Sequence, residues 1–179
     1  MLNIEQTVFV LIDVQGRLAQ AMYERALLIG SLRRALQGLR ALGVPVLWTE
    51  QNPARMGGTI PELAQLLPGE QPLPKMAFSC AGEPEVLRRL EALGRRQALL
   101  GGIEAHVCVF QTAADLLARG YETHILADGV SSRTARNRQI GLQRAAAEGA
   151  RISSVEMALF ELLRSASHPA FREILRLVR

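Results

Sequence analysis

The chain has 179 residues, of which 49% are hydrophobic and 21% charged, and its net charge is +4. This length suits one domain with a single core, and the composition excludes a disordered chain. No apolar run approaches the roughly 20 residues that a membrane span needs. The N-terminus carries no basic segment ahead of an apolar stretch, so we expect no targeting sequence. We therefore expect a single domain over 1–179, located in the cytoplasm and not bound to membranes.

The positive charge does not by itself indicate nucleic-acid binding. The arginines are spread over separate stretches, and aromatic residues make up only 4% of the chain. A nucleic-acid-binding surface needs basic residues gathered on one face. We expect a small-molecule substrate and no nucleic acid.

In the first half of the chain, β-branched apolar runs alternate with segments of helical periodicity. The run TVFVLIDV at 7–14 predicts a strand buried on both faces. Leucines at helical spacing predict a helix at 26–42, which ends before Gly43. Next come a strand at 44–50, a loop rich in Pro and Gly at 51–61, a short helix at 61–67, a weak strand at 75–80 and a helix at 83–93.

The second half repeats the alternation. Strands are predicted at 97–103, 121–127 and 151–155, and helices at 105–119, 137–148, 157–164 and 171–178. This order predicts an α/β fold with a mostly parallel sheet of about six strands and helices on both faces. Sites in such sheets lie beyond the carboxyl ends of the strands. The residues selected by that rule are Asp13, Glu50, Lys75, the segment 101–108 and Asp128.

Three of these residues form a chemically sensible unit. Asp13 can act as a general base, although a carboxylate there can equally cap a helix. Lys75 is the only lysine among 21 basic residues, and its ammonium would hold anions in place. Cys108 would lie one turn into a helix, where free N–H groups and the helix dipole favour a thiolate, lower its pKa and bind an oxyanion.

The two cysteines, Cys80 and Cys108, are too few for a disulfide scaffold, and each could be a small buried hydrophobic residue. For Cys80 a packed thiol is the preferred interpretation. His106 lies about 200° around the helix from Cys108, so it is badly placed as a base for that thiol.

Several stretches resemble the isochorismatase-like cysteine hydrolases. They are VFVLIDVQ (8–15), LPKMAFSC (73–80), GIEAHVCVFQTAADLLARGY (102–121) and DGVSSRTARNRQIGLQRAAAEGA (128–150). The resemblance covers almost the whole chain and implies a Rossmann-like three-layer sandwich. It also implies a catalytic triad of Asp13, Lys75 and Cys108.

The same resemblance implies a cis peptide bond between Ile103 and Glu104. This bond would turn the backbone N–H of Glu104 toward the site, where it would form an oxyanion hole with the N–H of Cys108. The nicotinamidases of the family carry an Asp/His metal cluster after the second strand, but WTEQNP stands here at 48–53. The three histidines are far apart, so we expect no metal and no cofactor. The stretch 49–63 is closer to the members named only for the isochorismatase domain.

We therefore predict a cysteine hydrolase of a small amide-like (C–N) substrate that works through a thioester intermediate. Since the family commonly assembles, we expect a homo-oligomer, with the apolar positions Ile174, Leu175, Leu177 and Val178 available for subunit contacts. One alternative is a catalytically silent oligomeric binding protein that keeps the fold. A nucleotide-binding oxidoreductase would need Gly-x-Gly-x-x-Gly after its first strand, where IDVQGR stands instead.

Overall fold

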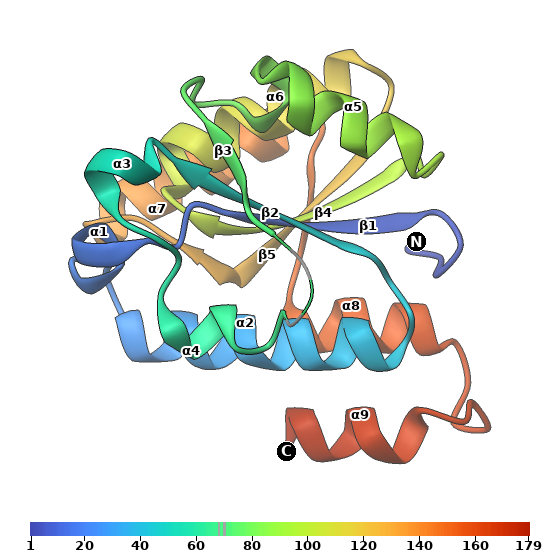
Figure 1. Cartoon of the computed structure of the whole chain (residues 1–179). Coiled ribbons are helices and arrows are strands. Elements are labelled where there is room, and N and C mark those ends of the chain that lie inside the picture. The colour runs from blue at the N-terminus through green and yellow to red at the C-terminus, as the bar shows by residue number, and fades with distance from the viewer. Residues whose placement is uncertain (68, 70) are drawn as a thin grey trace.

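The computed structural model describes residues 1–67, 69 and 71–179. Its centre is a six-stranded sheet in the order β3-β2-β1-β4-β5-β6, in which every neighbouring pair is parallel. The strands are β1 (Thr7–Ile12), β2 (Val46–Gln51), β3 (Leu73–Lys75), β4 (Gln97–Ile103), β5 (Glu122–Ser131) and β6 (Arg151–Ser153). Helices cover both faces, so the α/β three-layer prediction is confirmed (Figure 1).

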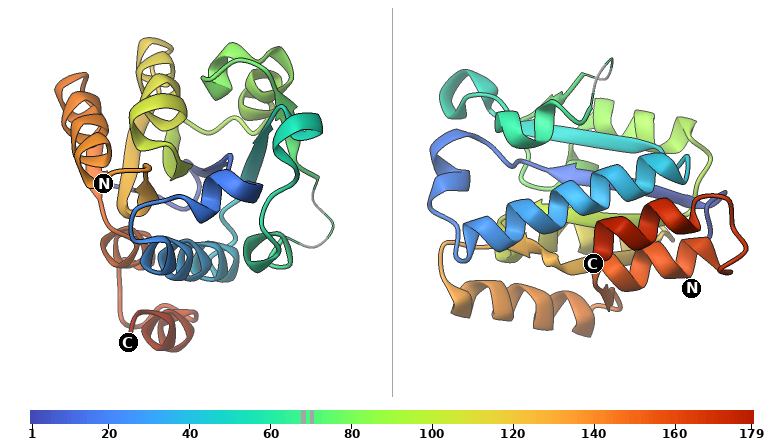
Figure 2. Two further views of the ribbon diagram at one scale, coloured as in Figure 1. Left: turned by 90° about the vertical axis from the view of Figure 1, so that its left-hand side faces the viewer. Right: turned by 90° about the horizontal axis from the view of Figure 1, so that it is seen from below.

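One face of the sheet packs against α2 (Arg25–Ala41) and α8 (Val155–Leu163), with α9 (Phe171–Val178) beneath them (Figure 2, right). The opposite face packs against α5 (Pro84–Ala92), α6 (Phe110–Ala118) and α7 (Ala135–Ala147). All six residues of β1 and all seven of β4 are buried, since both strands contact helices on both sides. Their continuous apolar runs follow from this double burial.

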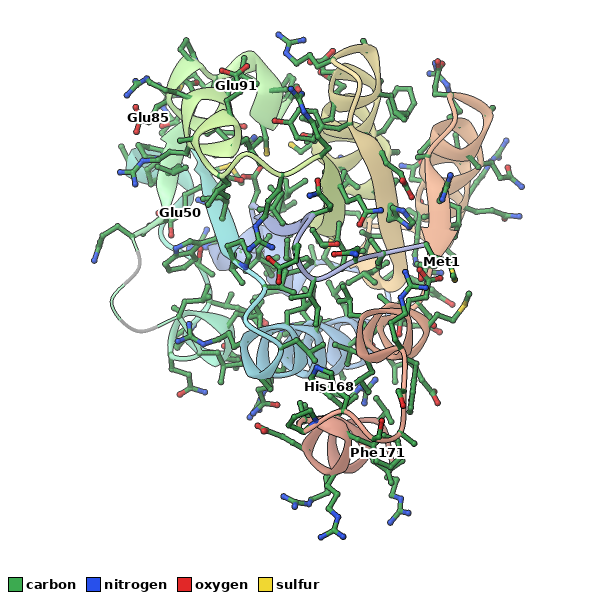
Figure 3. All side chains as sticks on the ribbon, turned by 90° about the vertical axis from the view of Figure 1, so that its right-hand side faces the viewer. Met1, Glu50, Glu85, Glu91, His168 and Phe171 are labelled. Carbon is green, nitrogen blue, oxygen red and sulfur yellow. The ribbon has the colours of Figure 1, made fainter. Side chains whose placement is uncertain are left out.

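The C-terminal apolar stretch packs within the chain rather than forming a free surface. Ile174 is fully buried in the core shared with α2 and α8, and Leu177 and Val178 pack against the same cluster. Figure 3, viewed from the amino ends of the strands, shows α9 starting at Phe171 below the other helices. Ile174 is thus excluded from subunit contacts by its burial, whereas the contacts expected of the half-buried Leu175, Leu177 and Val178 stay a prediction.

Two strand predictions need correction. The third strand ends at Lys75 instead of beginning there, because the chain turns around the Lys75 ammonium, which donates to the carbonyl oxygens of Ala77 and Phe78. The strand predicted at 121–127 runs on to Ser131 through a register shift against β4. Asp128 therefore lies inside a strand, and its carboxylate accepts from the backbone N–H of Val155 at the start of α8.

Smaller elements shape the carboxyl ends of the strands. The loop after β1 contains α1 (Gly16–Gln20), which the periodicity did not predict, and α3 (Pro53–Met56) follows β2. α4 (Pro61–Ala64) and the short 3-10 helix η1 (Cys80–Gly82) come later. The helix predicted at 105–119 begins as a π-helical turn, η2 (Ala105–Val109), before α6. No helix in the described part of the chain is long and apolar enough to span a membrane.

Candidate active site

The strand order reverses between β1 and β4, and the candidate residues gather at that point. β1 pairs with β2 on one side and with β4 on the other. The connections after β1 and β4 therefore leave in opposite directions, and ligands of open α/β sheets bind at such a switch point. Figure 2 (left) views this edge of the sheet, with α1 toward the viewer.

Asp13 is the first residue after β1, and its backbone takes a left-handed conformation with φ 53°. Asp and Asn tolerate this region better than most residues. The side chain is 2% exposed, and its two oxygens have separate partners. Oδ1 accepts a hydrogen bond of 2.7 Å from the Thr49 hydroxyl, and Oδ2 lies 2.7 Å from Nζ of Lys75. Asp13 is thus held as half of a buried ion pair.

Lys75 ends β3 with its side chain fully buried. Besides Asp13, its ammonium donates to Oε1 of Gln51 at 2.7 Å and to the carbonyl oxygens of Ala77 and Phe78 at 3.0 Å each. A buried charge is tolerated only when it is paired and hydrogen-bonded, and this ammonium meets both conditions. These contacts together fix the position of the Lys75 ammonium.

Cys108 lies in η2, directly after β4, and is 8% exposed. Burial raises the pKa of its thiol to about 12, and the negative charge of Asp13 and a hydrogen bond to Asp13 act in the same direction. The positive charge of Lys75 acts to lower it. The structure therefore brings Cys108 within reach of the other two residues. It corrects the expected lowering of the thiol pKa, because burial and the Asp13 carboxylate outweigh Lys75.

The peptide bond between Ile103 and Glu104 is cis. The Glu104 carboxylate accepts from the backbone N–H and the Nε of Arg133, at 3.0 and 3.2 Å. Close by, Nδ1 of His106 shares a 3.0 Å hydrogen bond with the Ser132 hydroxyl. Side chains from 104–106 therefore tie the start of η2 to the segment after β5.

Cys80 is a buried neighbour of the site. It is 0% exposed, which agrees with the packed thiol expected for it. Its Sγ lies 3.6 Å from the Thr49 hydroxyl, and its backbone N–H donates to Oγ1 of Thr112 at 2.9 Å. Burial and the charge of Asp13 raise the pKa of this thiol to about 11. Since the Thr49 proton goes to the Asp13 carboxylate, the Cys80 thiol is the donor to Thr49.

The motif analysis missed two residues that contact the site, Thr49 and Gln51. Both lie on β2, which is hydrogen-bonded to β1, and one reaches Asp13 while the other reaches Lys75. The strand-end rule could have selected them. It selected Glu50 instead, whose carboxylate accepts from the backbone N–H and hydroxyl of Thr59. Side chains alternate along a strand, so Glu50 points away from the face used by its two neighbours.

The described residues include no group of three or more His, Cys, Asp or Glu side chains placed to hold a metal ion. His124 pairs with Glu122, and Nδ1 of His168 accepts from the backbone N–H of Ala170. At the end of β2 the side chain that faces Lys75 is the Gln51 amide, which already accepts from the ammonium. The absence of a metal and of a cofactor remains a prediction.

Comparison with known proteins decides the family. The isochorismatase domain model matches residues 7–157, which is most of the chain. The chain belongs to the isochorismatase domain family. This match confirms the resemblance carried by the motifs after β1, β3 and β4.

Among the family's members, the isochorismatase domain-containing protein 1 of Danio rerio is 39% identical over 97% of this chain. The chain spans only 61% of that relative's length. A solved structure described as the MAR1 ribonuclease of Caenorhabditis elegans is 32% identical, with a TM-score of 0.92 over 99% of this chain and 91% of that one. The similarity to members named only for the domain is as predicted.

The YcaC gene product of Escherichia coli has the same fold, with a TM-score of 0.88 over 98% of this chain and 94% of that one. Its description is an octameric hydrolase of unknown specificity. At 17% identity this likeness concerns the fold alone.

Proposed function

We propose that this isochorismatase-family chain is a cytoplasmic cysteine hydrolase, folded as one domain over 1–179, that cleaves small amide-like (C–N) substrates without a metal or cofactor. The observation that carries the proposal is the placement of Cys108 against the buried Asp13–Lys75 pair at the switch point of the sheet. Acyl transfer through a thioester needs a thiol and a base that takes its proton, and Cys108 and Asp13 would supply these two groups.

In the proposed reaction, Asp13 acts as the general base because its carboxylate already contacts the thiol. It takes the proton of Cys108 as the sulfur attacks the substrate carbonyl. The thiol pKa of about 12 applies to the protein before substrate binds. The tetrahedral intermediate carries a negative oxygen, for which we propose the backbone N–H groups of Glu104 and Cys108 as the oxyanion hole.

Collapse of that intermediate breaks the C–N bond. The leaving amine takes the proton held by Asp13, and an acyl thioester remains on Cys108. Water then attacks the thioester carbonyl and gives its proton to Asp13. The carboxylic acid departs, and the proton returns from Asp13 to the Cys108 sulfur. Lys75 stays charged throughout and holds the Asp13 carboxylate in place.

The test is a panel of small amides and carbamoyl compounds with the wild-type protein and the Cys108→Ala variant. We expect turnover of at least one compound, and a loss of at least about 10³-fold in the variant, because the nucleophile is essential to this mechanism. Acid quenching followed by peptide mass spectrometry would place the trapped acyl group on the peptide containing Cys108. An acyl group on Cys80 would contradict the proposal. Wild-type protein that turns over nothing would favour the silent binding protein.

RNA cleavage is a second candidate, because the Caenorhabditis elegans relative is described as a ribonuclease. A single-stranded RNA oligonucleotide belongs in the same panel. RNA cleavage by the wild-type protein that Cys108→Ala abolishes, without turnover of any amide, would replace the amide proposal.

A further inference from the structure

A cavity of about 410 Å³ lies between α1 and α3, and the site described above does not use it. It is lined by Gly16, Arg17, Leu18, Arg55, Met56 and Gly57. α1 follows β1 and α3 follows β2, so the cavity opens at the same edge of the sheet as the candidate active site (Figure 1). A volume of this size suits part or all of a small molecule.

The walls of this cavity are held by specific contacts. The Gln15 side chain donates to the carbonyl oxygen of Gly57 at 2.7 Å, and residue 15 also forms a bridge with Thr59. A Cβ atom on Gly16 would lie 2.5 Å from the carbonyl oxygen of Met56, so only glycine allows the two loops to approach this closely. The cavity is thus a built part of the fold.

Among the described residues, two arginines are the charged side chains that line the cavity. Neither Arg17 nor Arg55 forms a side-chain hydrogen bond or ion pair with the described residues. Some arginines of the chain pair with carboxylates, as Arg25 does with Glu62 and Arg151 with Glu122, whereas Arg17 and Arg55 are exposed and accessible to a ligand. A guanidinium stays protonated and presents donors that match carboxylate and phosphate oxygens.

The nearby carboxylates are engaged elsewhere. Glu50 accepts two hydrogen bonds from Thr59, and Glu62 pairs with Arg25. Among the described residues that line the cavity none is acidic, so an anion there would meet two guanidinium groups, with the Glu50 carboxylate turned to Thr59 behind the wall.

The cavity is also connected to the candidate active site. Gln15, which bonds Gly57 at the cavity wall, accepts from the backbone N–H of Gln51 at 2.7 Å. The Gln51 side chain in turn accepts from the Lys75 ammonium at 2.7 Å. The same two amide side chains therefore position one wall of the cavity and the cation of the site.

We propose that Arg17 and Arg55 form an anion subsite, which binds the carboxylate or phosphate group of a small amide substrate whose C–N bond is cleaved at Cys108. This inference rests on the proposed hydrolase function and adds to it the class of the substrate. The anionic group would lie between α1 and α3, and the amide would extend toward Asp13 and Lys75.

The first test measures binding without catalysis. Inorganic phosphate and succinamate are titrated by calorimetry into Cys108→Ala, alone and combined with Arg17→Gln and Arg55→Gln. We expect both ligands to bind Cys108→Ala, and affinity to fall at least tenfold when both arginines are replaced. Arg172→Gln on α9 is the matched control for loss of a surface charge. Equal affinities in all variants, or binding of an RNA oligonucleotide but of neither small anion, would overturn the subsite.

The second test measures specificity with matched pairs of anionic and neutral amides, such as succinamate and succinamide. We expect the ratio of kcat/KM for the anionic over the neutral member to fall at least tenfold in the double arginine variant. An unchanged ratio would overturn the subsite while leaving the hydrolase proposal intact. Arginine-dependent anion binding without any Cys108-dependent turnover would instead contradict the hydrolase proposal.

Discussion

At the scale of single residues, Cys108 is a buried neutral thiol that is hydrogen-bonded to Asp13, its proposed general base. Its pKa of about 12 lies far above neutral pH, so only a small thiolate fraction exists there, and that fraction grows about tenfold per pH unit. In the proposed mechanism we therefore expect activation by transfer of the thiol proton to Asp13 during attack, and not by a thiolate present beforehand.

This arrangement predicts opposite effects of Asp13→Asn on alkylation and on catalysis. Removing the carboxylate charge removes a cause that raises the thiol pKa, while Lys75, which lowers it, remains. We expect Cys108 to react with iodoacetamide several-fold faster at pH 7, whereas turnover is lost with the general base. Peptide mass spectrometry over pH 7–10 measures the labelling at Cys108 and Cys80 separately. Unchanged or slower labelling of Cys108 would contradict the prediction, and Asp115→Asn controls for the change in net charge.

Thr49 acts on the reaction through Asp13, since its hydroxyl donates to Oδ1 while the Cys80 thiol donates to it. Thr49→Val keeps the shape but removes the donor. We expect kcat to fall about tenfold, with KM nearly unchanged, because the Asp13 carboxylate loses the hydrogen bond that orients it. Thr49→Ser should restore kcat. A Ser variant as slow as the Val variant would assign Thr49 a packing role only.

At the scale of elements, the position of Cys108 depends on how closely α7 approaches η2. A Cβ atom on Gly141 would lie 2.6 Å from the carbonyl carbon and oxygen of Ala105 and 2.7 Å from the backbone nitrogen of His106. These are backbone atoms of the turn that carries Cys108, so they cannot move without moving the thiol.

We therefore expect Gly141→Ala to lower the free energy of unfolding by about 1–3 kcal/mol and to reduce kcat. Gly30 in α2 is the matched control, because a Cβ atom there meets nothing within 4 Å. Gly30→Ala should be neutral or stabilise by up to about 1 kcal/mol. Urea denaturation of both variants measures the effect. Equal stabilities for the two variants would show that α7 can shift without cost.

The amino ends of β4, β5 and β6 meet around Glu122. Burial acts to raise the pKa of this carboxyl, but hydrogen bonds from His124 and Gln97 and the charge of Arg151 outweigh it and lower the pKa from 4.5 to about 2. A lowered pKa contributes stability that is present above pH 4.5 and is lost as pH falls toward 2.

We accordingly expect Glu122→Gln to be less stable than the wild-type protein at pH 5.5, with the difference mostly gone near pH 2. Urea denaturation at both pH values measures this difference. A gap of equal size at the two pH values would mean that the ionised carboxylate contributes nothing to stability.

At the scale of the whole molecule, the oligomeric state is the property to be tested. We expect a homo-oligomer in solution, a dimer or larger, with a mass above the 19.6 kDa of one chain. Ile174 of α9 is buried, so we expect the contacts to use more exposed apolar side chains, among which are Ile152 and Met157. Light scattering after size-exclusion chromatography measures the mass. A single species of 19.6 kDa at micromolar concentration would contradict the prediction.

Much of the fold could be predicted because its signals are local. Apolar runs marked β1 and β4, helical spacing of leucines marked α2, and glycines marked helix ends. The misses arose where tertiary contacts override local pattern. β3 stops where the chain wraps around the Lys75 ammonium, and β5 continues past Asp128 because β4 supplies a partner beyond the register shift.

The same division holds for the candidate site. The sequence by itself determined the family and the residues Asp13, Lys75 and Cys108, because strand ends and motifs are visible along the chain. Only the tertiary structure decided the state of the thiol and the partners of Asp13, since both depend on burial and on side chains such as Thr49 that are distant in sequence. Electrostatic energies follow distance and solvent exposure, and neither can be read from the order of residues.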